Sequence, residues 1–211
     1  YRKDVIKIIN DFFSYIFNKN NRINSKKGYK YGLNIIISSI PVGICGLLFK
    51  NPIENRLGNI TILGFAFLLT ALSLFIVKDI KGHKEDKDIN FKDAIIIGLF
   101  QMITLIPGIS RSGTVLVACL ILKLKKENAL KYTFMLYFPV SIGAMILGIK
   151  DIIESPNLNL LIMPYVIGML VAIIVTYFSF EWLSNIVKKG KLIYFAIYCL
   201  FLAAFVFIYF R

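Results

Sequence analysis

The chain has 211 residues, of which 57% are hydrophobic and only 18% are charged, and its mean hydropathy is +0.71. Soluble domains are about 45–50% apolar and about 25% charged. The composition therefore excludes a disordered chain, a disulfide scaffold and an ordinary water-soluble globule, and it indicates an all-α polytopic membrane protein. The formal net charge of +13 comes from basic residues in short segments between apolar runs, so we expect a bilayer and not a nucleic acid as the partner.

Five apolar runs are long enough to cross a bilayer. A hydrocarbon core about 30 Å thick needs about 20 helical residues, and roughly 17 to 25 are tolerated. The spanning helices are expected over residues 33–49, 60–77, 132–149, 160–180 and 192–210. Residues 1–32 instead combine apolar pairs with basic residues in a helical period, which predicts a cytoplasmic or interfacial segment.

A sixth apolar region, residues 94–122, is interrupted in its middle. It contains the run Pro107-Gly108-Ile109-Ser110-Arg111-Ser112-Gly113-Thr114, which a continuous spanning helix should not contain. The apolar arms on either side have 13 and nine residues, or about 20 and 14 Å as helices. Each arm would end part way through the membrane, so we expect a re-entrant helical hairpin with a deep turn.

The distribution of lysine and arginine favours the same topology. If residues 94–122 enter and leave by one face, twenty basic residues lie on one side of the membrane and four on the other, with Arg111 inside. A single crossing would give 15 against nine, which is a much weaker bias. Because basic residues accumulate in cytoplasmic loops, the count predicts a hairpin open to the cytoplasm, residues 1–32 in the cytoplasm and the C-terminus outside. Residues 1–211 would form a single integral membrane domain.

Arg111 is the most informative residue. A guanidinium near the bilayer centre costs at least about 2.5–3.5 kcal/mol on insertion scales, and such residues usually face a cavity. No acidic residue lies in any of the apolar runs to neutralise it. Free N–H groups at a helix start and a planar guanidinium both suit phosphate oxygens, so a phosphate site is predicted. Its candidate residues are Gln101, Gly108, Ser110, Arg111, Ser112, Gly113 and Thr114.

Simpler interpretations of these residues stay open. Ser-Gly-Thr is also an ordinary helix N-cap and Pro-Gly an ordinary terminator, although capping leaves Arg111 without a partner. Gln101 is placed to hydrogen-bond either the ligand or the returning arm of the hairpin. All acidic residues and the single histidine lie in loops or at segment ends, and the three cysteines are too far apart for a metal site. The sequence thus predicts a phosphate clamp without a base, and no metal ligands in this chain.

The pattern around Arg111 extends to residues 97–101, 105–113 and 132–135, with Pro139. With the run Pro-Gly-Ile-Ser-Arg-Ser-Gly, it resembles the undecaprenyl-diphosphatase family, also called bacitracin-resistance proteins. The resemblance implies two inverted repeats, each with a re-entrant hairpin, of which residues 94–122 would be the second. It also implies hydrolysis of undecaprenyl diphosphate to undecaprenyl phosphate and phosphate, which recycles the lipid carrier of bacterial cell-wall synthesis and gives bacitracin resistance.

The same resemblance implies a bacterial cell-membrane location, a divalent cation (Mg or Ca), and a diphosphate site with Arg111 and Ser110 as catalytic residues beside Ser112 and Gln101. The family's first motif, a glutamate-rich stretch followed by Ser-Ser-Thr-Gly-His, has no match. We therefore expect the first repeat to be truncated, with its acid/base and metal-binding carboxylates missing and the fragment alone inactive. Val115 also stands where the family usually carries threonine, with Thr114 one position earlier.

Two other functions remain as alternatives from the sequence. One is a lipid-phosphate or anion carrier that uses the same clamp without hydrolysis. The other is an inactive truncated paralogue. A homodimer is left open.

Overall fold

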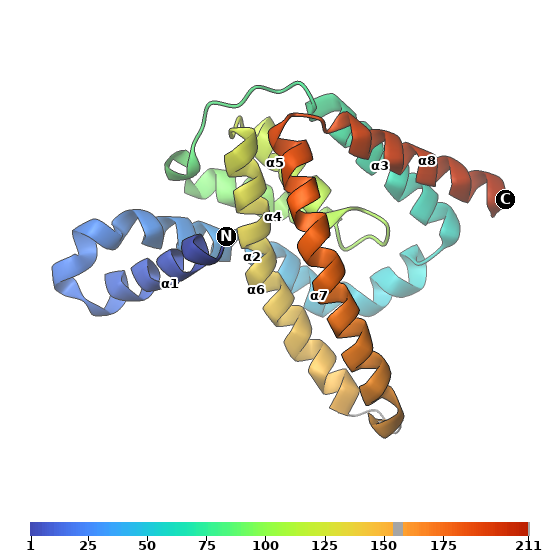
Figure 1. Ribbon diagram of the computed structural model, residues 1–211, viewed down its shortest axis with the longest axis horizontal. Coiled ribbons are helices and arrows are strands. Elements are labelled where there is room, and N and C mark those ends of the chain that lie inside the picture. The colour runs from blue at the N-terminus through green and yellow to red at the C-terminus, as the bar shows by residue number, and fades with distance from the viewer. Residues whose placement is uncertain (154–157, 211) are drawn as a thin grey trace.

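The computed structural model describes residues 1–153 and 158–210, and this part of the chain is helical throughout, with no strand (Figure 1). The α-helices in chain order are α1 (Arg2–Phe17), α2 (Arg22–Leu57), α3 (Ile60–Val77), α4 (Phe91–Ile103), α5 (Arg111–Ile121), α6 (Lys126–Ile153), α7 (Leu158–Lys188) and α8 (Ile193–Tyr209). Two short 3-10 turns, Lys19–Asn21 and Asp86–Asp88, precede α2 and α4. The all-α class expected from the composition is confirmed.

Four helices are long and apolar enough to cross a bilayer. Their candidate spans are Arg22–Phe49, Ile60–Val77, Lys126–Ile146 and Ile162–Lys188. The last helix, α8, is apolar but has 17 residues, or about 26 Å, at the short end of the range for a span. The protein is therefore a polytopic membrane protein, and a fifth crossing by α8 stays a prediction.

The N-terminal region differs from the expected boundaries. α2 begins at Arg22, inside the region 1–32 that was expected to form a separate interfacial segment. α1 folds back along the first turns of α2, where the ring of Tyr29 stacks on Phe12 and Tyr15 with centroids 5.2 and 4.1 Å apart. The hydropathy pattern could not show this extension, because the added residues are mostly polar and pack against α1.

The interrupted region 94–122 forms two short helices, and the chain reverses direction between them. α4 has 13 residues and α5 has 11, about 20 and 17 Å long, so neither could cross a core of about 30 Å. The chain before α4 meets the chain after α5: the Lys84 N–H donates to the Lys123 carbonyl and the Lys125 N–H donates to the Lys84 carbonyl, both at 2.9 Å. The chain therefore leaves the hairpin at the end where it entered; the depth of the turn in a membrane stays a prediction.

Several basic connecting segments lie together at this open end of the hairpin. Lys131 at the start of α6 forms ion pairs with Asp4 of α1, at 2.9 Å, and with Asp86, at 3.0 Å. The Lys126 ammonium donates to the carbonyl of Lys78 at the end of α3, at 3.0 Å. The end of α6 and the start of α7 lie at the far end of the molecule (Figure 1). This grouping agrees with the side assigned to these segments from the basic-residue count.

α4 lies closely against α2 through small residues. The Ser38 hydroxyl donates to the Ala94 carbonyl at 2.8 Å, and the hydroxyl of the fully buried Tyr132 lies 2.8 Å from Ser38 Oγ. A Cβ atom at Gly98 would lie 2.8 Å from the Ser38 carbonyl oxygen, closer than real side chains approach. Gly98 therefore sets the distance between the two helices.

We predict that Gly98→Ala destabilises the protein. The added methyl group meets backbone of α2, which cannot move aside without breaking the Ser38 bonds, so a loss of about 1–3 kcal/mol is expected. The measurement is the unfolding of the purified protein in detergent. Gly43→Ala is the matched control on α2, because no atom lies within 4 Å of its Cβ position. Equal stability of the two variants would contradict the close packing.

A second prediction concerns the exposed loop before α4. Glu85 pairs with Lys125 at 2.6 Å and with Lys87 at 3.1 Å, and its hydrogen bonds to these two lysines lower its pKa below the ordinary carboxyl value. A lowered folded-state pKa contributes stability above the unfolded-state pKa, and this contribution is lost as the pH falls through the folded value. We expect Glu85→Gln to be slightly less stable than wild type at pH 7 and equal to it in acid. A stability difference that persists in acid would contradict this assignment.

Candidate functional site

A cavity of about 730 Å³ lies between α4, α5, α6, α7 and the start of α1. Its polar lining comes from Tyr1, Arg2, Gln101, Arg111, Ser112, Thr133, Tyr137 and Thr176. Its apolar lining comes from Val5, Ile6, Val115, Phe134, Phe138 and Phe180, among others. The cavity is thus an apolar chamber with a few polar groups and with the motif arginine on its wall, an arrangement typical of ligand sites.

Arg111 is the first residue of α5 and is half-buried. Within the described part of the chain, its guanidinium makes no ion pair and no hydrogen bond. The positive end of the α5 dipole adds to its charge. The first turn of α5 therefore presents a positive potential to the cavity, which suits an anionic group.

Ser110 caps α5. Its hydroxyl oxygen accepts a hydrogen bond from the Gly113 N–H at 3.1 Å, and its own N–H donates to the Thr70 hydroxyl of α3 at 3.4 Å. Thr70 in turn donates to the Ala66 carbonyl at 3.0 Å. The turn that carries Arg111 is therefore fixed both by a cap and by α3.

Gly108 explains how the turn can lie against α3. Its backbone φ is +92°, in the region that favours glycine, and a Cβ there would lie 2.5 Å from Leu63 Cδ1 and 3.0 Å from Ala66 Cβ. At Gly113 the Cβ position is 3.0 Å from the Ser110 hydroxyl. Both glycines thus have close protein neighbours, and these contacts hold the start of α5 in place.

Gln101 lies on α4 and lines the same cavity as Arg111. Its side chain is 1% exposed, and its Oε1 is buried without a hydrogen-bond partner among the described residues. α4 ends two residues later, at Ile103, and the Thr104 hydroxyl donates to the Gln101 carbonyl at 2.6 Å. A buried amide oxygen without a donor is uncommon, because it loses its hydrogen bonds to water without replacement.

The structure divides the predicted site residues between two cavities. A smaller cavity of about 310 Å³ lies on the α3 and α8 side of the motif. The larger cavity is lined by Gln101, Arg111 and Ser112, and the smaller one by Gly108, Ser110, Ser112 and Gly113. Ser112 lines both, together with Thr133 and Phe134, and Thr114 lines neither. Ser112 is the predicted hydroxyl that faces Arg111's cavity.

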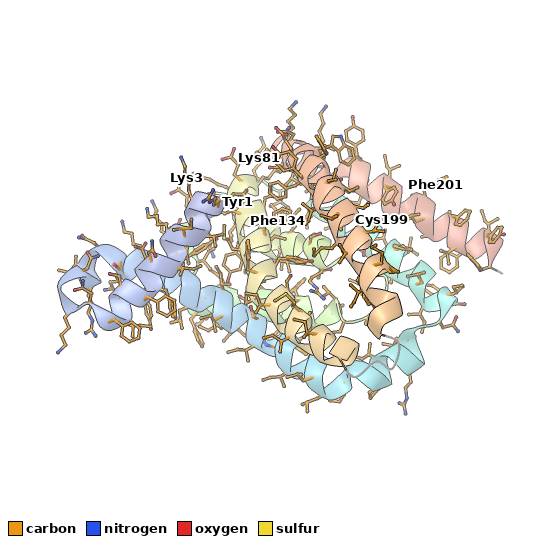
Figure 2. The ribbon with its side chains drawn as sticks, turned by 60° about the horizontal axis from the view of Figure 1, so that its bottom comes forward. Tyr1, Lys3, Lys81, Phe134, Cys199 and Phe201 are labelled. Carbon is orange, nitrogen blue, oxygen red and sulfur yellow. The ribbon has the colours of Figure 1, made fainter. Side chains whose placement is uncertain are left out.

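Residues of α6 and α7 in the larger cavity were not found from the sequence. Phe180 contacts Phe134 edge-on at 4.7 Å between centroids and Tyr1 at 5.9 Å, and this aromatic group closes one side of the chamber. Figure 2 shows Tyr1 and Phe134 close together near the middle of the molecule. In the sequence these aromatic residues belong to ordinary apolar helices, and only the packing of α6 against α7 and α1 distinguishes them from lipid-facing neighbours.

The residues of the larger cavity do not fit a divalent cation. Mg²⁺ and Ca²⁺ prefer carboxylate and carbonyl oxygens, and no carboxylate lines this cavity. Among residues 1–153 and 158–210 no group of three or more His, Cys, Asp or Glu side chains is placed to hold a metal ion. The described side chains of the site instead suit an anion.

The chain matches the family model described as Bacitracin resistance protein BacA over residues 1–205. The chain belongs to this family. An undecaprenyl-diphosphatase 2 of Bacillus thuringiensis (strain Al Hakam) is 42% identical over 200 residues, which cover 95% of this chain and 73% of that protein. An undecaprenyl-diphosphatase 1 of Bacillus licheniformis is 40% identical over 94% of this chain and 73% of its own length. The undecaprenyl-diphosphatase of Oceanobacillus iheyensis is 37% identical over 99% of this chain and 76% of its own length. The family resemblance predicted from the hairpin motif is confirmed.

We predict that Ser110→Ala lowers the stability of the protein by about 1 kcal/mol, because it removes the acceptor that caps α5. Ser110→Asn keeps a capping oxygen and should restore most of this loss. Ser112→Ala serves as the control, since no hydrogen bond of the Ser112 hydroxyl holds the turn within the described residues. Thermal unfolding in detergent measures all three variants, and an equal loss for Ser110→Ala and Ser110→Asn would contradict the cap.

Proposed function

We propose that this protein is a membrane phosphatase that hydrolyses undecaprenyl diphosphate to undecaprenyl phosphate and inorganic phosphate. The proposal takes its substrate from the names of relatives about 40% identical to the chain. The reaction recycles a lipid carrier of cell-wall synthesis and opposes bacitracin, in agreement with the family description. The enzyme class is therefore a phosphoric anhydride hydrolase.

The single observation that carries this proposal is an arginine without an ionic partner on the wall of an apolar chamber. Arg111 has no anionic partner among the described residues, and a diphosphate head group would supply one. In a site of low dielectric such a pairing is stronger than in water, and it grows as charge develops on the phosphoryl oxygens in the transition state. Arg111 is therefore proposed as the residue that binds the diphosphate and stabilises that charge.

The apolar part of the chamber supports a lipid as the substrate. A free diphosphate would gain nothing from walls made by Val5, Ile6, Phe134 and Phe138. An isoprenoid chain attached to the diphosphate would bury apolar surface there, at about 25 cal/mol per Å². The combination of two cationic side chains, Arg2 and Arg111, with apolar walls thus matches an amphiphilic phosphate better than a soluble one.

The remaining motif residues have proposed roles around Arg111. Ser110 is proposed to act with Arg111 at the phosphoryl group: its oxygen caps α5, and no described group accepts its hydroxyl hydrogen. Ser112 and Gln101 are proposed to contact the substrate from the cavity wall. Gly108, Gly113 and Thr114 are proposed to bind the substrate by shaping the turn. The N–H groups of Gly113 and Thr114 donate to the Ser110 hydroxyl and carbonyl, so the α5 backbone donors proposed for the phosphate are those of Arg111 and Ser112.

The proposed setting is the bacterial cell membrane, with α1 and the open end of the hairpin in the cytoplasm and the C-terminus outside. The grouping of basic segments around Lys131 and Lys126 supports this orientation. A divalent cation (Mg or Ca) is part of the proposal by family resemblance. Since the described cavity residues do not suit a cation, its oxygen ligands would have to be other groups.

The test is the release of phosphate from undecaprenyl diphosphate by the complete gene product in detergent. Arg111→Ala should lower kcat/KM by about 10²–10³, because it removes a preorganised charge at the developing oxyanion. Lys189→Ala, an exposed cation after α7, is the control and should be unaffected. Activity of Arg111→Ala within about threefold of wild type would contradict the proposal. A wild-type protein that binds the lipid diphosphate and releases no phosphate would favour the carrier.

A further inference from the structure

Two unsatisfied polar groups face the larger cavity from opposite arms of the hairpin. On α4, the Gln101 side chain is 1% exposed and its Oε1 has no donor among the described residues. On α5, the Arg111 guanidinium carries five N–H donors, and none of them has a described acceptor. α4 and α5 pack against each other, and both side chains line one chamber. An acceptor that lacks a donor thus lines the same chamber as a donor group that lacks acceptors.

Arg2 also brings a guanidinium to the chamber, but it belongs to α1, whereas Arg111 lies on the helix that packs against α4. Thr133 and Ser112 do not offer Gln101 an equivalent donor. The Thr133 hydroxyl donates its hydrogen to the Ala129 carbonyl at 2.8 Å. Ser112 is exposed and sits beside Arg111 at the start of α5. A guanidinium presents donors along two edges in one plane, so it can donate to an amide oxygen with one edge and to two phosphate oxygens with the other.

We propose that Gln101 is the positioning residue of Arg111. In the ligand-bound state its Oε1 accepts a hydrogen bond from the guanidinium, which leaves the bidentate edge of Arg111 aimed at the diphosphate. The inference rests on the proposed function for the identity of the anion. Gln101 thereby contacts the returning arm of the hairpin, and this contact acts on the reaction through Arg111, in addition to the proposed contact of Gln101 with the substrate.

This role gives a reason for a glutamine at a fully buried position. A long side chain fixed at one point loses less conformational entropy when it binds a ligand, so preorganisation raises affinity without a new contact to the ligand. A carboxylate in place of the amide would hold the guanidinium as well but would cancel its charge. An amide holds Arg111 and leaves its charge available to the diphosphate.

A double-mutant cycle tests the coupling in the complete gene product. The four proteins are wild type, Gln101→Met, Arg111→Lys and the double variant, and the readout is kcat/KM for phosphate release from undecaprenyl diphosphate. Methionine keeps the length of glutamine and removes the acceptor, and lysine keeps the charge and removes the planar fork. We expect each single change to cost about tenfold or more and the pair to show a coupling of at least about fivefold. Independent effects, additive within about twofold, would overturn the inference.

A matched control separates coupling from packing. Ile97 lies one turn before Gln101 on α4, is fully buried and belongs to the hydrophobic core. Ile97→Val perturbs the same helix without a polar group, so its cycle with Arg111→Lys should be additive. Gln101→Glu is the second variant. It keeps an acceptor, so a cycle that compares it with Gln101→Met should show coupling to Arg111, while its negative charge weakens diphosphate binding. Loss of coupling in Gln101→Glu as well would overturn the inference.

A binding measurement keeps the inference separate from the proposed function. The dissociation constant of methylenediphosphonate, which cannot be hydrolysed, is measured for the same four proteins by calorimetry. If wild type releases no phosphate, the proposed function fails, and the binding cycle still decides whether Gln101 and Arg111 act as a unit. Coupled binding effects support the positioning role, whereas independent effects contradict it even where phosphate is released.

Discussion

The charge of Arg111 is the constraint on which the arrangement of the hairpin depends. In an apolar environment a guanidinium without a counter-ion is costly, and within the described residues no carboxylate reaches it. A spanning helix would leave this charge among lipid chains. Two short helices that meet at an irregular turn instead place it on the wall of a chamber, at the N-terminal end of α5. The break in the helix is therefore the feature that makes an anion site possible.

An irregular turn needs support from its surroundings, and two neighbouring helices provide it. The tip of the turn packs against α3 at Gly108, and the Ser110 N–H donates a hydrogen bond to Thr70 of α3. α2 packs against α4, the first arm of the hairpin, at Gly98, where a Cβ atom would meet the α2 backbone. The open end of the hairpin is closed by backbone bonds at Lys84 and by the ion pairs of Lys131. The hairpin that carries Arg111 is thus held by contacts at its tip, along one arm and at its open end.

Much of this could be predicted from the sequence, because the main signals are local. The apolar run 60–77 coincides with α3, and the Pro-Gly-Ser-Arg run marks the turn where the chain reverses. The start of α2 at Arg22 was missed, since its polar first turns are stabilised by α1 and not by a hydrophobic run. The division of the motif between two cavities and the contribution of Phe180 depend on how α6 and α7 pack, which no spacing along the chain encodes.

The most direct test of the reversal is cysteine labelling from each face of the membrane. In a background with Cys45, Cys119 and Cys199 replaced by alanine, single cysteines are placed before the hairpin, at Lys87, after it, at Lys125, and between α2 and α3, at Asn59. Sealed vesicles of known orientation are treated with an impermeant maleimide. The account predicts that positions 87 and 125 react from the same face and position 59 from the opposite one. Labelling of positions 87 and 125 from opposite faces would contradict it.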